Sequence, residues 1–106
     1  LTVDTYRITE NRNFLNDFGL RDQMRRSSVS IPSNITEGDD LDTDRQSIRH
    51  FYIARGSVAE LRTQLIISKD IGFITLSQYD RFEEICHKIC AMLTMLIRHR
   101  SNKNNI

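Results

Sequence analysis

The sequence predicts an all-α protein, an antiparallel four-helix bundle of the up-down-up-down type. Apolar residues recur at three- and four-residue spacing in four segments, and turn-forming polar residues separate these segments. One proline and four glycines in 106 residues leave room for long helices. No segment shows the two-residue alternation of a strand. At this length, residues 1–106 are expected to form one domain.

The first helix is expected over residues 1–10, which carry a loose apolar stripe. No capping residue precedes this stripe, so we expect the helix to be truncated at its N-terminus. Residues 11–18 are rich in asparagine and aspartate, which favour turns. We therefore expect the first connection there, with Asp17 as the N-cap of the next helix.

The second helix is expected over residues 19–38, where apolar residues again follow helical spacing. Pro32 lies inside this segment and removes one backbone N–H group. We expect one helix kinked at Pro32, because three serines lie within five residues upstream and their hydroxyl groups can satisfy freed carbonyl groups. Gly38 is expected to end this helix.

The third helix, expected over residues 44–71, has the clearest pattern in the chain. Its seam residues, spaced three and four apart, are Phe51, Ala54, Val58, Leu61 and Leu65. Gly56 and Ser57 lie in the middle of this helix. Since glycine inside a helix costs up to about 1 kcal/mol relative to alanine, we expect another backbone to approach closely there. Gly72 is expected to cap the helix in the left-handed conformation.

The fourth helix is expected over residues 77–100, and residues 101–106 are expected to fray. Its apolar stripe is wide, which indicates burial against more than one neighbour, such as another subunit. Cys86 and Cys90 are four residues apart on this helix, a spacing that is poor for a disulfide. We therefore expect both to be small buried residues.

The sequence lacks the motifs of common enzyme classes. There is no phosphate-binding loop, dinucleotide fingerprint or zinc protease motif, and the three histidines suggest no catalytic triad. Glu84 and His87 form one Glu-x-x-His pair, but a di-iron bundle needs a second pair and two further glutamates. We expect no enzymatic activity, cofactor, metal site or small-molecule substrate.

Charge is distributed unevenly along the chain. The net charge of +1 argues against general electrostatic binding as the main property of the protein. However, residues 37–44 hold five acids and no base, whereas no acid follows Glu84. This pattern indicates an acidic end and a basic end, or simply two solvated surfaces.

No apolar run approaches the length of a membrane span, and we expect no signal peptide. We therefore expect a cytoplasmic protein without a membrane partner.

One polar cluster is expected to be structural. We hypothesise that Arg26, or its neighbour Arg25, pairs with Glu60 or Glu37 inside the bundle and fixes the helix register. The alternative is a set of exposed ion pairs, each worth about 0–1 kcal/mol.

Residues 19–38 contain Gly-Leu, then Gln-x-x-Arg, then Ser-Ile-Pro-x-Asn-Ile-x-Glu-Gly. This order and spacing closely resemble the signature of the 23S rRNA intervening-sequence proteins, also called S23-type four-helix bundle proteins. Residues 51–65 and 71–74 match as well, so the resemblance covers roughly residues 1–96. Departures from the family pattern are small. The family more usually has alanine at the positions of Ser27 and Thr36, and its first helix is longer.

The resemblance implies an antiparallel four-helix bundle that assembles with itself, as relatives that form ring-like homopentamers do. Some members are encoded within insertions of bacterial 23S rRNA genes, and no enzymatic activity is attached to the family. A distantly similar bundle assists a reverse transcriptase through a basic surface.

Two functions stay open. The first is an oligomer associated with RNA or a ribonucleoprotein. Its expected phosphate contacts are Arg21, Arg25, Arg98, Arg100 and Lys103. The second is a protein-interaction scaffold or accessory subunit with no nucleic-acid role. The discriminating feature is whether the basic residues converge on one face.

Overall fold

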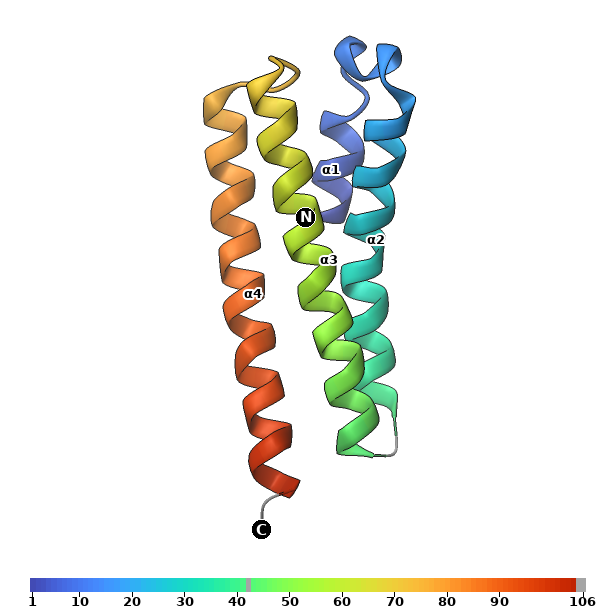
Figure 1. Cartoon of the computed structure of the whole chain (residues 1–106), viewed down its shortest axis with the longest axis vertical. Helices are drawn as coiled ribbons and strands as arrows, with labels where there is room; N and C mark the ends of the chain where they lie inside the picture. The colour runs from blue at the N-terminus through green and yellow to red at the C-terminus, as the bar shows by residue number, and fades with distance from the viewer. Residues whose placement is uncertain (42, 105–106) are drawn as a thin grey trace.

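The computed structural model describes residues 1–41 and 43–104, the last two by their backbone alone. The helices are α1 (Thr2–Ile8), the 3-10 helix η1 (Arg12–Asn16), α2 (Phe18–Asp40), α3 (Asp44–Asp70) and α4 (Leu76–Asn104). Successive α-helices run in opposite directions along a molecule of 52 × 21 × 17 Å (Figure 1). The α3 helix packs against both α2 and α4, and α1 packs against α2. The predicted all-α bundle class is confirmed, and no strand occurs among the described residues.

Side chains cap the starts of the three long helices. Asp17 and Thr43 each accept a hydrogen bond from the backbone N–H three residues on, at 2.9 and 3.3 Å. Thr75 and Gln78 bond each other's backbone N–H groups reciprocally, at 3.1 and 2.9 Å. These bonds satisfy N–H groups that have no partner within the first turn.

The seam predicted on α3 is confirmed. Its five residues, Phe51, Ala54, Val58, Leu61 and Leu65, are at most 1% exposed. The connection after α1 adds a core residue that was not predicted, because the composition of residues 11–18 is typical of a turn. Phe14 is fully buried, and its ring packs edge-on against Phe73 with 5.1 Å between centroids. Hydrophobic packing therefore closes this end of the bundle.

The α2 helix continues through Pro32 without ending. Proline has no N–H to donate to the carbonyl of Ser28, four residues earlier. The hydroxyl of Thr2 donates to that carbonyl at 2.8 Å instead. The freed carbonyl is thus satisfied from α1, whereas the sequence suggested the serines of α2 as donors.

Two expectations about glycines are wrong. Gly38 does not end α2, which runs to Asp40; it is buried, and a Cβ atom there would lie 2.6 Å from Cε1 of Phe51. Gly56 shows no close backbone approach, because a Cβ atom there would meet nothing within 4 Å. Tight packing thus occurs at Gly38, and Gly56 opens onto the surface.

The end of α3 follows a regular pattern. Gly72 has φ of +81°, its N–H donates to the carbonyl of Lys69 at 3.0 Å, and the N–H of Phe73 donates to the carbonyl of Ser68 at 2.8 Å. These two bonds form a Schellman motif. The α4 helix runs to Asn104, four residues beyond the predicted end at residue 100. Residues 105–106 of the segment expected to fray lie outside the described part of the chain.

Candidate nucleic-acid interface

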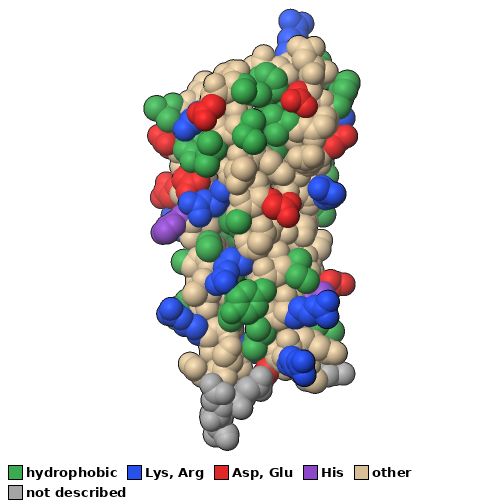
Figure 2. Space-filling view, viewed as in Figure 1, with side chains coloured by type: hydrophobic (Ala, Val, Ile, Leu, Met, Phe, Trp, Pro, Cys, Tyr) green, Lys and Arg blue, Asp and Glu red, His purple; other side chains and the backbone are tan. Residues whose placement is uncertain are grey.

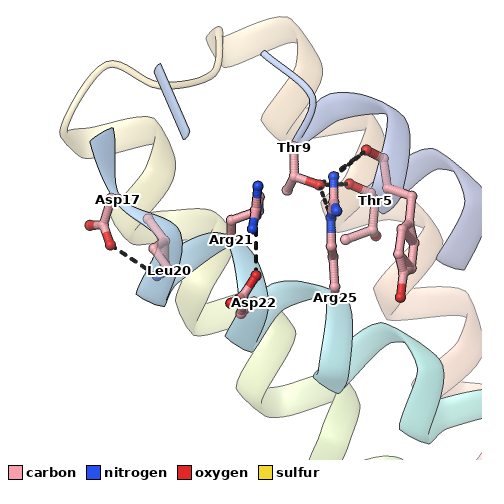
Figure 3. A network of polar contacts seen from close by, with 8 residues as sticks. Thr5, Thr9, Asp17, Leu20, Arg21, Asp22 and Arg25 are labelled. Carbon is pink, nitrogen blue, oxygen red and sulfur yellow. Dashed lines mark hydrogen bonds and ion pairs between the residues drawn. The ribbon is translucent and has the colours of Figure 1, made fainter. Parts of the chain in front are cut away.

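Arg25 was expected to contact phosphate, but it is bound to α1 (Figure 3). Its Nε donates to Oγ1 of Thr9 at 2.9 Å and its Nη2 donates to the carbonyl of Tyr6 at 3.4 Å. The guanidinium also lies 4.8 Å from the centroid of the Tyr6 ring. Because the last carbonyls of a helix lack partners within it, Arg25 caps α1.

We expect Arg25→Met to lower the free energy of unfolding by about 1–2 kcal/mol, since it removes two hydrogen bonds and a cation–π contact. Urea unfolding would measure the loss, and hydrogen exchange would show α1 opening first. The matched control is Arg26→Met, at an exposed neighbouring arginine, expected to change stability by less than about 0.5 kcal/mol. Equal losses in the two variants would contradict the capping role.

Two more of the expected phosphate contacts are engaged within the chain. The Nε of Arg21 lies 3.1 Å from Oδ1 of Asp22, and its guanidinium lies 4.5 Å from the ring centroid of Phe18. The Nη1 of Arg100 donates to Oδ1 of Asp44 at 3.0 Å and ties α4 to the start of α3. The acidic segment between α2 and α3 therefore partly neutralises the basic end of α4.

The two remaining expected phosphate contacts are Arg98 and Lys103, both on α4. Arg98 is exposed and forms no ion pair with any described residue. Lys103 lies in the last turn of α4, and its side chain is outside the described part of the chain. Arg21 and Arg25 lie near the α1 end of α2, whereas Arg98 and Arg100 lie near the opposite end of the bundle, so these five residues do not form one site.

The hypothesis of a buried cluster of Arg26, Glu37 and Glu60 is wrong. All three residues are exposed, and no ion pair joins them. The carboxylate of Glu37 lies 3.4 Å from Nδ1 of His50, and Glu60 accepts a hydrogen bond from the hydroxyl of Ser27 at 3.3 Å. These surface contacts contribute little to stability.

A different basic surface forms where α3 and α4 pack together. Residues 45–59 of α3 contain three arginines and no acid, and residues 85–104 of α4 contain no acid either. Antiparallel packing places the two segments side by side. A hydrogen bond shows this contact, since Nη1 of Arg55 donates to Oγ1 of Thr94 at 3.4 Å. In Figure 2, Lys and Arg side chains predominate in the lower half of this face, and most acids lie above.

Two adjoining hollows, of about 410 and 310 Å³, lie on this face and share Cys90. Residues of α3 and Cys90 line the larger hollow, and residues of α4 alone line the smaller one. We call them together the basic furrow. Small residues contribute much of their lining: Gly56, Ala59, Cys90 and Ala91. Larger polar and aromatic side chains also line it, namely Tyr52, Arg55, Arg62, His87, Thr94 and Arg98, together with the apolar Val58 and Met95.

The arginines in and beside the furrow differ in their availability. Arg62 forms a two-point ion pair with Glu83, and this hydrogen bonding raises the pKa of Arg62 above its usual value. Its charge is therefore compensated. Arg45 and Arg49 continue the surface along α3; both are exposed and form no ion pair with a described residue. With Arg55 and Arg98, they make this face positive.

The two thiols near the furrow differ as well. Cys86 is fully buried, and burial raises the pKa of its thiol to about 11. The nearby Glu83 carboxylate acts in the same direction. Cys90 is half-buried and lines both hollows. Cys86 is therefore an inert thiol near neutral pH, and Cys90 is placed to report on the furrow.

No three His, Cys, Asp or Glu side chains gather in a metal-binding arrangement among the described residues. None of the described helices combines the length and hydropathy needed to cross a lipid bilayer.

The model of the family described as 23S rRNA-intervening sequence protein matches residues 1–95. Among solved structures, the chain is similar to a protein from Bacteroides thetaiotaomicron, described as a protein with unknown function from the S23 ribosomal protein family. The TM-score is 0.82 and the identity 25%, over 91% of this chain and 87% of that chain. Comparison with curated proteins gave no match. Because the family model spans nearly all of the sequence, the chain belongs to the 23S rRNA-intervening sequence protein family.

Proposed function

We propose that this protein is a non-enzymatic, self-associating helical bundle that binds the phosphate backbone of RNA through the basic furrow. The observation that carries the proposal is the juxtaposition of two segments without acids, residues 45–59 and 85–104, along one face. Arginine suits this role, because its planar guanidinium can donate two parallel hydrogen bonds to a phosphate. The family description, which refers to 23S rRNA, supports RNA as the polyanion.

A net charge of +1 is low for a nucleic-acid-binding protein, so one subunit is expected to bind weakly. Self-association would repeat the furrow in each subunit and raise the overall affinity through multivalency. Exposed apolar residues at the opposite end of the bundle support self-association. They are 41–63% exposed: Leu15, Phe18, Ile66, Ile67, Ile71 and Leu76. We propose that a second copy of the chain covers them, in a ring if the contact closes.

The same apolar side chains favour the second candidate function, a scaffold for other proteins. Exposed apolar residues gathered at one end of a molecule mark protein interaction sites. In that case the apolar end is the working surface, and the basic furrow has no ligand.

The test is a titration of the purified protein against fluorescently labelled structured RNA at about 50 and 200 mM salt, with its mass determined by light scattering. We expect binding that weakens steeply with salt, because each phosphate contact releases counterions. A mass above that of one chain would support self-association. Absence of binding at the lower salt concentration would contradict the RNA proposal and favour the scaffold.

Alkylation of Cys90 would locate the bound RNA. At about pH 8 the buried Cys86 should stay unmodified, since its pKa of about 11 leaves little thiolate. RNA bound in the furrow should slow the modification of Cys90, as peptide mass spectrometry would show. Unchanged modification at saturating RNA would place the binding site elsewhere.

A further inference from the structure

Tyr52 is an exposed aromatic residue within the positive face. The residue is 49% exposed, whereas the neighbouring Phe51 is fully buried in the core. The Tyr52 hydroxyl makes no hydrogen bond to any described residue. Core packing therefore does not account for an aromatic side chain at this position.

Arg55 supports this ring from one side. Its guanidinium carbon lies 4.8 Å from the ring centroid, and its Nη1 donates to the hydroxyl of Thr94 on α4. Cation–π attraction and this hydrogen bond both restrict the arginine. Since the guanidinium covers one side of the ring and about half of the residue is still exposed, the ring also presents surface to solvent.

Open space lies next to Tyr52. Gly56 follows it by one helical turn. Apart from the adjoining backbone of α3 itself, no atom of the described residues lies within 4 Å of the position that a Cβ would take there. Together with Ala59 and Cys90, Gly56 helps to line the larger hollow of the furrow, of about 410 Å³. The small residues therefore leave space for a planar group beside the ring, next to Arg55 and Arg62, which also line this hollow.

We propose that Tyr52, supported by Arg55, is a stacking platform for an unpaired nucleobase. The basic furrow would then prefer RNA with unpaired bases, such as single strands and loops, over continuous duplex. This inference rests on the proposed RNA-binding function and specifies its substrate class. Bases inside a duplex are already stacked on each other, so a duplex can offer only phosphates and groove edges to this face. An unpaired base can place its flat face on the tyrosine while Arg49 and Arg98 contact phosphates on either side.

The test compares a fluorescently labelled single-stranded RNA with a fully paired duplex of the same length at one salt concentration. We expect tighter binding of the single strand. Tyr52→Ala should weaken that binding by about 5- to 150-fold, as expected for one stacked base, and change duplex binding by less than about twofold. It should leave the salt slope unchanged, because it removes no phosphate contact.

Tyr52→Phe is the matched control, since it keeps the aromatic ring and loses only the hydroxyl. It should bind the single strand within about twofold of the original protein. Because the chain has no tryptophan, tyrosine fluorescence can be followed directly. Stacking should quench this fluorescence in the original protein, and the quenching should be lost in Tyr52→Phe.

The possible failures of the two proposals can be told apart. Equal binding of single strand and duplex, together with unchanged affinity in Tyr52→Ala, would overturn the platform and leave the basic furrow standing. Equal weakening of both RNAs by Tyr52→Ala would also overturn the preference. If neither RNA binds at low salt, the RNA-binding function itself fails, and the platform with it.

Discussion

We expect the same substitution at two glycines, Gly38→Ala and Gly56→Ala, to change the stability of this bundle in opposite directions. A methyl group at position 38 would lie 2.6 Å from Cε1 and 3.0 Å from Cδ1 of Phe51. Phe51 is fully buried, so its ring cannot move aside without disturbing the core. Overpacking of this kind costs about 1–3 kcal/mol, more than the gain of up to about 1 kcal/mol from alanine's higher helix propensity.

At position 56 only the propensity gain operates. Beyond the adjoining backbone of α3, a methyl group there meets no atom of the described residues within 4 Å, so Gly56→Ala should raise the free energy of unfolding by up to about 1 kcal/mol. Urea unfolding followed by circular dichroism would measure both variants, and both should keep the helical signal. A stabilised Gly38→Ala would contradict the packing described here, and a strongly destabilised Gly56→Ala in a monomeric sample would indicate an unseen neighbour.

These glycines show which parts of the fold could be predicted from the sequence and which could not. The helices and the buried seam of α3 follow from periodicity, because burial on one face imposes a three-and-four spacing within the helix itself. The reason for a glycine inside a helix depends on which other helix passes nearby. At Gly38 the cause is Phe51, thirteen residues away along the chain, and no local pattern reveals it.

The functional surface was predictable in part. The absence of acids after Glu84 is plain in the sequence, and Arg98 does lie on the basic furrow. The matching segment in α3, with Arg49 and Arg55, was missed, although its lack of acids is visible too. This α3 segment becomes part of a basic surface only because antiparallel packing brings it beside α4. The bonds that hold Arg25 to α1 were not predicted, because its partners are a hydroxyl and a carbonyl, which no charge pattern indicates.

The surface can be tested by removing three arginines of this face together: Arg55 and Arg98, which line the furrow, and Arg49 beside it. We expect Arg49→Ala/Arg55→Ala/Arg98→Ala to weaken RNA binding by about 10- to 100-fold at low salt, since one exposed ion pair is worth up to about 1 kcal/mol. For single-stranded RNA, the slope of log affinity against log salt should fall by about 2, because each lost phosphate contact contributes about 0.7. Fluorescence titrations at four or more salt concentrations would give both quantities.

The control removes the same charge from the other side of the bundle. Arg7, Arg12 and Arg26 are exposed on α1, η1 and α2, and none forms an ion pair with a described residue. Their triple alanine variant should bind within about threefold of the original protein and keep its salt slope, because these arginines are not on the helices that line the furrow and salt screens more distant charges. If both triple variants lose affinity equally, RNA responds to the net charge of the protein, and the alignment of two acid-free segments has no special role. If only the Arg49/Arg55/Arg98 variant loses RNA affinity, the position of these arginines on one face determines binding, and the net charge of the protein does not.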